Sequence, residues 1–271
     1  MRSTLFYFFL LITFNLSAQN FSKKTAPIVE EGIRLYKLEM AAWIGTDIYL
    51  AKNKDVKKVD GYFAYSDKYD ATRCIFFSKD AEPKVIGEVT FTNEFTEESA
   101  KSNFKKRAFT ESENQVYLLR KKSLDLIARD TFFKKYDKMN LNLIPIIYGR
   151  KKKVYIMTGP QINNVVVYGN DYLLTFNKKN KLRKKKALHK NMMTFKYGGD
   201  KNDVAVMHSH TKGSGEFISA TDICTTMLYE KFTEWKTKIV ISKKYVSIWD
   251  CQKDKLTIMT REAFDALDKP K

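Results

Sequence analysis

The spacing of apolar residues predicts a long helix and three strands in the first part of the chain. Over residues 28–50 apolar positions recur every three or four residues, with Leu35, Leu38 and Ala42 on one face, as in an amphipathic helix. Three strand-like runs follow, separated by turn-forming segments: residues 61–65, 72–77 and 85–91. The pattern predicts a helix followed by an antiparallel meander.

The second part begins with another apolar stripe at helical spacing, over residues 112–138. Strand-like runs come next, at residues 143–148, 154–158, 164–167, 172–176, 192–195 and 204–210. A helix over residues 219–235, two strands at residues 238–241 and 245–249, and a short helix from Thr260 end the chain. We therefore expect an α+β protein, with an N-terminal α+β region over residues 20–110 and a second domain over residues 111–271, an antiparallel sheet flanked by helices.

The first 19 residues have the order of a cleavable signal peptide. Arg2 is followed by an apolar run over residues 5–14 and by the small residues Ser17 and Ala18 before Gln19. A run of about ten apolar residues suits export but is too short to span a bilayer, which needs about twenty. A buried N-terminal helix is the alternative. We expect a secreted or periplasmic protein with no lipid anchor and no transmembrane anchor.

The net charge of +18 is spread through the chain but peaks in two basic runs, residues 150–153 and 178–186. Such runs attract anionic surfaces, but both lie where strands are expected to turn, and solvated hairpin tips are the simpler interpretation. Neither run has the interleaved aromatic residues of a nucleic-acid platform, so no nucleic acid is expected as a partner.

The chain has three cysteines, Cys74, Cys224 and Cys251. In an oxidising compartment Cys224 and Cys251 could form a bridge, which would leave Cys74 free and buried. No Cys-x-x-Cys pair is present, which excludes a zinc ribbon built from thiolates.

Two of the three histidines, His208 and His210, are separated by one residue at the end of an expected strand. Residues i and i+2 of a strand point to the same face, so both imidazoles can reach one metal ion. Asp222 follows in the first turn of the next expected helix, and two imidazoles with one carboxylate leave the fourth position of a zinc ion open. Without a metal, Ser219 and Asp222 would form an ordinary capping box. His189 could be an additional ligand, although a partly exposed strand histidine is the simpler interpretation.

The segments His208-Ser209-His210, Gly213-Ser214-Gly215 and Ser219-Ala220-Thr221-Asp222 resemble the metal motif of the JAB/MPN (JAMM) metalloproteases. The order of helices and strands over residues 112–260 is similar as well. The resemblance implies a JAMM-like sheet flanked by helices and a zinc ion held by His208, His210 and Asp222. It also implies that Ser219 helps to hold an oxyanion.

The chain departs from the JAMM pattern in two ways. Residues 211–218 make a loop of eight residues where the family has seven, a difference that a loop tolerates. The family's general base is a glutamate on an early strand, and no glutamate occurs between Glu113 and Glu216. Glu111, Glu113 or Glu216 would have to replace it, and we take Glu216 as the candidate. Without a carboxylate to accept a proton from water, a metal alone hydrolyses peptides poorly.

Two hypotheses follow. The first is an exported zinc protein with a JAMM-like domain, a weak or inactive hydrolase of peptide or isopeptide bonds. The second is a non-catalytic envelope binding module with basic loop tips. The partner stays open between a protein or peptide substrate and an anionic envelope surface.

Overall fold

The computed structural model describes residues 4–53, 56–67, 71–92, 94–189, 191–198 and 204–267, with side chains from residue 21 onward. The chain forms two compact units. The terminal unit comprises Met1–Ile33 and Asn202–Lys271, and the central unit comprises Arg34–Lys201. Residue 111, at which the second domain was expected to begin, lies inside the central unit.

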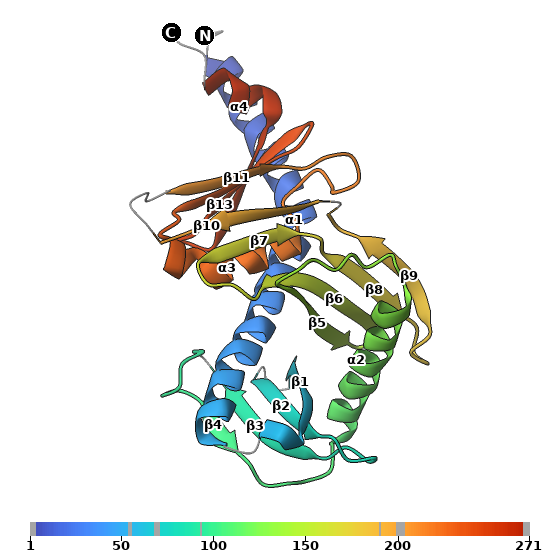
Figure 1. Ribbon diagram of the computed structural model, residues 1–271. Helices are drawn as coiled ribbons and strands as arrows, with labels where there is room; N and C mark the ends of the chain where they lie inside the picture. Colours follow the sequence, from blue (N-terminus) through green and yellow to red (C-terminus); the bar gives the residue numbers. More distant parts are fainter. Residues whose placement is uncertain are drawn as a thin grey trace. The chain divides into compact units, whose positions relative to one another are not determined.

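The described part of the chain is an α+β protein, as predicted (Figure 1). The helices are α1 Thr4–Lys52, the 3₁₀ helix η1 Val56–Lys58, α2 Glu111–Arg129, α3 Ala220–Thr233 and α4 Arg261–Leu267. The strands are β1 Val59–Ser66, β2 Thr72–Ser78, β3 Val85–Phe91, β4 Lys101–Asn103, β5 Met139–Tyr148, β6 Lys151–Pro160, β7 Val165–Gly169, β8 Tyr172–Phe176, β9 Leu182–Ala187, β10 Met192–Lys196, β11 Ala205–Ser209, β12 Thr237–Ile241, β13 Tyr245–Asp250 and β14 Lys255–Thr260.

In the central unit α1 is followed by an antiparallel meander of β1, β2, β3 and β4, in that order. This confirms the predicted helix and meander, to which the structure adds the short strand β4. Every second residue of β3 is buried. The aromatic residues Phe63 and Phe77 form the core of this region with Ile75 and Val116, the last contributed by α2. The alternation of apolar residues therefore decided which face of the meander is inside.

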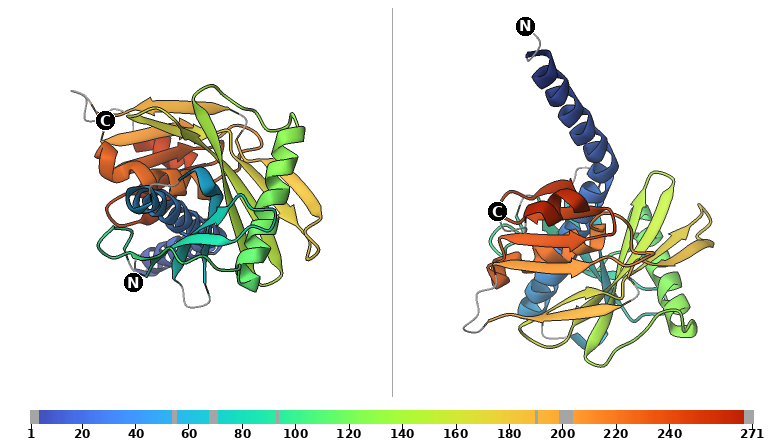
Figure 2. Two further views of the ribbon diagram at one scale, coloured as in Figure 1. Left: turned by 60° about the horizontal axis from the view of Figure 1, so that its bottom comes forward. Right: turned by 90° about the horizontal axis from the view of Figure 1, so that it is seen from above.

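The second sheet of the central unit has the order β5-β6-β8-β9 and is antiparallel throughout. Helix α2 lies along one face of this sheet (Figures 1 and 2). Its residues Leu119 and Ile127 pack against Val154, Ile156 and Leu174. Strands β7 and β10 form a separate antiparallel pair in the same unit.

Helix α2 ends at Arg129, so the predicted extension to residue 138 is wrong. Asp130 leaves the helix in an extended conformation (φ −119°, ψ 113°), and its carboxylate accepts a hydrogen bond from the Phe132 N–H. Phe132 and Phe133 then pack their rings against Tyr172. Tertiary packing of these aromatic residues overrides the helical spacing of the sequence.

The sequence suggested that the basic run 178–186 is a hairpin tip, but only part of the run forms a turn. Its first residues form a turn in which the Asn177 side chain accepts from the N–H groups of Lys179 and Lys181. The remainder forms β9, the edge strand of its sheet. Edge strands of natural proteins often carry lysines, which oppose pairing with another chain. The run 150–153 begins in the β5–β6 turn and enters β6 at Lys151.

The terminal unit is built on the sheet β11-β12-β13-β14, in which β11 and β12 are parallel and the other pairs antiparallel. Helix α3 connects the parallel pair. The first part of α1 packs closely on α3, because a Cβ atom on Gly32 would lie 2.8 Å from Ile223 Cβ. Trp249 of β13 is fully buried in the core of this unit.

The N-terminal segment bears on the export prediction. The backbone of α1 is described from Thr4, whereas Arg2 lies outside the described residues. Within the described part of the chain, no helix combines the length and apolar character that crossing a membrane requires. Removal of residues 1–19 and export therefore stay predictions.

Candidate metal centre

Strand β11 brings His208 and His210 to one face of the terminal unit's sheet. The strand alternates between exposed and buried residues, with Val206 and His208 inside, and His210 continues this alternation just beyond the strand end. The His210 N–H donates to the Ile241 carbonyl at 2.7 Å, which extends the pairing with β12 by one residue. Both imidazoles are buried, with 5% and 8% of each histidine exposed. The period of two predicted from the sequence is confirmed.

The N-terminus of α3 positions Asp222. Ser219 is the N-cap residue, and its hydroxyl accepts from the Asp222 N–H at 3.0 Å. In return Asp222 Oδ2 accepts from the Ser219 N–H at 2.9 Å, which completes the predicted capping box. Because α3 connects two parallel strands, it begins near the end at which β11 finishes. This connection brings a carboxylate to the two histidines.

The Asp222 carboxylate faces both imidazoles. Its Oδ2 atom lies 3.1 Å from His210 Nε2, and its Oδ1 atom lies 3.4 Å from His208 Nε2. The ring centroids of the two histidines are 5.2 Å apart, with 33° between the ring planes. Each of the three side chains is at most 8% exposed. The structure thus brings together the three residues that the sequence singled out.

This arrangement could hold a metal ion. Ligand atoms of His208, His210 and Asp222 lie within 4.8 Å of one another. A zinc ion with bonds of about 2.0–2.1 Å places tetrahedral ligands roughly 3.3 Å apart, close to the two nitrogen–oxygen distances found here. The same distances suit hydrogen bonds from the two rings to the carboxylate. The residues therefore fit a metal site in which small shifts of the rings admit the ion.

A fourth polar group, Lys238, lies at the site and was not predicted from the sequence. This lysine is fully buried on β12, and its Nζ lies 2.8 Å from His208 Nδ1. Burial lowers the pKa of Lys238 to about 7, although the nearby Asp222 carboxylate acts in the opposite direction. The alternation of the strand 237–241 could have indicated it, because Lys238 shares the inward face with Val240.

Lys238 influences which proton His208 carries. A charged Lys238 donates to Nδ1, so that the proton of neutral His208 is on Nε2 and points at Asp222. A neutral Lys238 can instead accept from Nδ1–H, which leaves the Nε2 lone pair available to a metal ion. With a pKa of about 7, Lys238 can take either form near neutral pH.

The other predicted site residues lie as follows. The Ser219 hydroxyl donates to Asp222 Oδ2 at 2.7 Å and lies 3.0 Å from Thr221 Oγ1, so it belongs to the helix cap. Glu216 is exposed and pairs with Lys244 at 3.2 Å. Among the described residues that group around the candidate metal position, Asp222 is the only carboxylate. The roles of Ser219 with an oxyanion and of Glu216 as general base stay predictions.

His189 and the cysteines complete the predicted residues. His189 follows β9 in the central unit and is buried, not partly exposed as expected, and its Nδ1 lies 3.3 Å from Asp171 Oδ2. All three cysteines are free thiols, so the bridge considered between Cys224 and Cys251 is not formed. Burial, reinforced by Glu230, raises the pKa of the Cys251 thiol to about 12.

Comparison with known proteins adds no relative. No family model matches the chain, and no curated protein and no solved structure matches it. The resemblance to the JAMM motif therefore rests on the residues of the chain alone.

Proposed function

We propose that this chain is an exported metal-binding protein whose terminal unit holds zinc in a JAMM-like site. The observation that carries the proposal is the buried Asp222 carboxylate, which faces His210 Nε2 at 3.1 Å and His208 Nε2 at 3.4 Å. Two imidazoles and one carboxylate are a ligand set typical of zinc and leave one position for water or a further ligand. The signal-like order of residues 1–19 supports export.

The site favours metal binding over efficient hydrolysis. A zinc ion in such a site can activate water, but peptide hydrolysis also needs a group that accepts the proton. Asp222 is committed to the helix cap and would itself be a ligand, and Glu216 is paired with Lys244 at the surface. We therefore propose that any hydrolysis of peptide or isopeptide bonds is weak.

A zinc titration of metal-free protein tests the proposal. We expect isothermal titration calorimetry to give one zinc ion per chain for the unmodified protein. His208→Ala and His210→Ala should abolish stoichiometric binding, whereas the matched control Glu216→Ala should bind as the unmodified protein does. If His189 is an additional ligand, as the sequence allows, His189→Ala keeps the stoichiometry but lowers the affinity. Absence of stoichiometric zinc in the unmodified protein contradicts the proposal.

A second candidate function is the non-catalytic binding module. The observation that favours it is β9, an edge strand on which Arg183, Lys184, Lys185 and Lys186 are all exposed. Lys185 pairs with Asp130, whereas the strand as a whole presents an excess of positive charge. Such a strand attracts polyanions and anionic lipid, and the attraction decreases with salt.

Binding to vesicles that contain anionic lipid tests this second function. Replacing Arg183, Lys184 and Lys186 by serine should weaken binding at low salt. Replacing Lys243, Lys244 and Lys253 of the terminal unit removes the same charge elsewhere and should have a smaller effect. Equal binding of the two triple variants contradicts a role for β9.

A further inference from the structure

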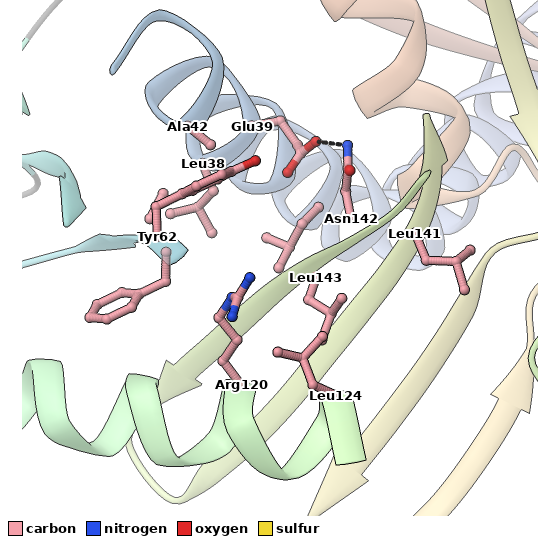
Figure 3. A pocket seen from close by; sticks show the side chains of 12 residues that line it. Leu38, Glu39, Ala42, Tyr62, Arg120, Leu124, Leu141, Asn142 and Leu143 are labelled. Atoms are coloured by element: carbon pink, nitrogen blue, oxygen red, sulfur yellow. Dashed lines mark hydrogen bonds between the residues drawn. The ribbon is translucent and has the colours of Figure 1, made fainter. Parts of the chain in front are cut away.

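A second polar site lies in the central unit. Between α1, β1, α2 and β5 there is a small, partly enclosed cavity of about 100 Å³ (Figure 3). Its apolar wall includes Leu38 and Leu143, and its polar lining includes Glu39, Arg120 and Asn142. Figure 3 shows Arg120 reaching into this space from α2, opposite Glu39 and Asn142.

The guanidinium of Arg120 is the unusual feature of the cavity. Among the residues that the structure describes, none forms an ion pair or hydrogen bond with it. Asp60 and Tyr62 favour its charge only at longer range, and the Phe77 ring centroid lies 6.0 Å away. Burial lowers the pKa of Arg120, yet an arginine remains charged at neutral pH. A half-buried cation without a close partner is costly, and a bound anion would offset that cost.

Glu39 on the opposite side does not supply the missing negative charge. Its Oε2 accepts a hydrogen bond from Asn142 Nδ2 at 3.2 Å. Burial nevertheless raises the pKa of Glu39 to about 7, the Asn142 contact opposing this only in part. Near neutral pH a large fraction of Glu39 is therefore protonated, and the cavity carries net positive charge.

We propose that this cavity binds a small organic carboxylate, a short hydroxy acid, whose carboxylate pairs with Arg120 and whose hydroxyl meets the Glu39–Asn142 pair. Planar, bidentate recognition of carboxylate is the geometry for which a guanidinium is suited. Leu38 and Leu143 would contact the carbon chain between the two polar ends. The cavity, at about 100 Å³, is smaller than the apolar cavity of about 150 Å³ that accommodates benzene, and it is only partly enclosed, so it suits a short carboxylate and not an aromatic acid.

The proposal predicts how binding depends on pH. Ionised Glu39 would repel a second carboxylate, so binding should weaken as the pH rises through about 7. The other groups that face Glu39 are Arg120 on α2, Tyr62 on β1, Cys74 on β2 and Asn142 on β5. Arg120 stays charged, and burial raises the pKa values of Tyr62 and Cys74, so neither ionises near neutral pH.

The test uses the full chain and a set of probes: acetate, propionate, lactate, benzoate, and lactamide as the uncharged analogue. NMR titration should show saturable binding that is strongest for lactate at about pH 6, weak for lactamide and absent for the larger benzoate. Arg120→Gln should lower lactate affinity at least tenfold. The control Arg129→Gln, an exposed arginine on the same helix, should leave it unchanged.

Two further variants separate the ends of the site. Glu39→Gln should retain lactate binding and remove its decrease above about pH 7. Asn142→Leu should weaken lactate more than propionate, because only lactate has a hydroxyl to lose a partner. Equal binding of lactate and lactamide, equal affinity of the Arg120→Gln and unmodified proteins, or no saturable binding of any carboxylate overturns the proposal. The comparison of lactate with lactamide uses only the unmodified protein, so it tests the proposal even if Arg120→Gln does not fold.

Discussion

Two helices of this protein begin with the same local motif and use it differently. Helix α2 is capped by Thr110, with Glu113 three residues later, and α3 is capped by Ser219, with Asp222 three residues later. In both, the cap hydroxyl accepts from the backbone of the acidic residue, whose carboxylate accepts from the backbone of the cap residue. Both acidic residues are 1% exposed.

The two carboxylates differ in what the tertiary structure places against them. Glu113 receives two hydrogen bonds of 2.7 Å from the Arg107 guanidinium. Burial acts to raise the pKa of Glu113, but the bonds from Arg107 and Thr110 outweigh it and lower the pKa. Asp222 instead faces the rings of His208 and His210. A fixed cation makes the first box a structural cap, whereas two imidazoles that could ligate a metal make the second a candidate site.

The largest expected effect at a fixed pH comes from removing the cation of the first box. Arg107→Leu leaves Glu113 buried without its partner and should lower the free energy of unfolding by about 3 kcal/mol. Urea unfolding measures this. The neighbouring Lys106→Leu is the control, because Lys106 and its partner Asp80 are both exposed and such pairs contribute at most about 1 kcal/mol. Equal effects of the two substitutions would contradict the assignment of α2 as a charge-stabilised cap.

Neutralising the acid of each box should separate their functions. Asp222→Asn should lower zinc affinity more than about 100-fold, because the site loses both a ligand and its negative charge. Glu113→Gln makes the same chemical change in the α2 box and should leave zinc binding unaltered. Calorimetric titration of both variants decides this, and retained zinc in Asp222→Asn removes that carboxylate from the ligand set.

The buried lysine of the α3 site gives a pH-dependent difference. The pKa of Lys238 is about 7 in the folded chain, against an ordinary value of 10.5 that applies to the unfolded chain. At a pH between these two values Lys238 is therefore protonated in the unfolded chain and largely neutral in the folded chain. The free energy of unfolding should therefore rise with pH in this range, by roughly 3 to 4 kcal/mol from about pH 7 to about pH 10. Lys238→Met should lack the rise attributable to this lysine. Urea unfolding of chelator-treated protein at several pH values tests it, and identical slopes would mean that Lys238 is not the source.

The smallest expected effect is the loss of a cap hydroxyl, which should destabilise both helices equally. Thr110→Ala and Ser219→Ala each remove a cap hydroxyl and should each lower the free energy of unfolding by about 1 kcal/mol. Similar losses in metal-free protein show that the two caps are locally equivalent. A much larger loss in Ser219→Ala would mean that its hydroxyl does more than cap α3.

The local sequence determined a good part of this structure. The apolar periods placed the later part of α1, the meander β1–β3 and the start of α2, and the capping box of Ser219 and Asp222 located the start of α3. The one-residue spacing of His208 and His210 placed both on one face of β11. These features depend on helical or strand geometry within a few residues, which is why they can be predicted without knowing the fold.

Tertiary structure decided what those local features mean. The end of α2 depends on aromatic packing against Tyr172, and the assignment of residues 182–187 to β9 depends on pairing with β8. Lys238 meets His208 because β12 pairs in parallel with β11, a pairing across 30 residues that no local pattern specifies. The same capping motif faces an arginine in α2 and two imidazoles in α3. The sequence by itself determined where each cap lies, and the packing of distant strands determined the charge that each buried carboxylate meets.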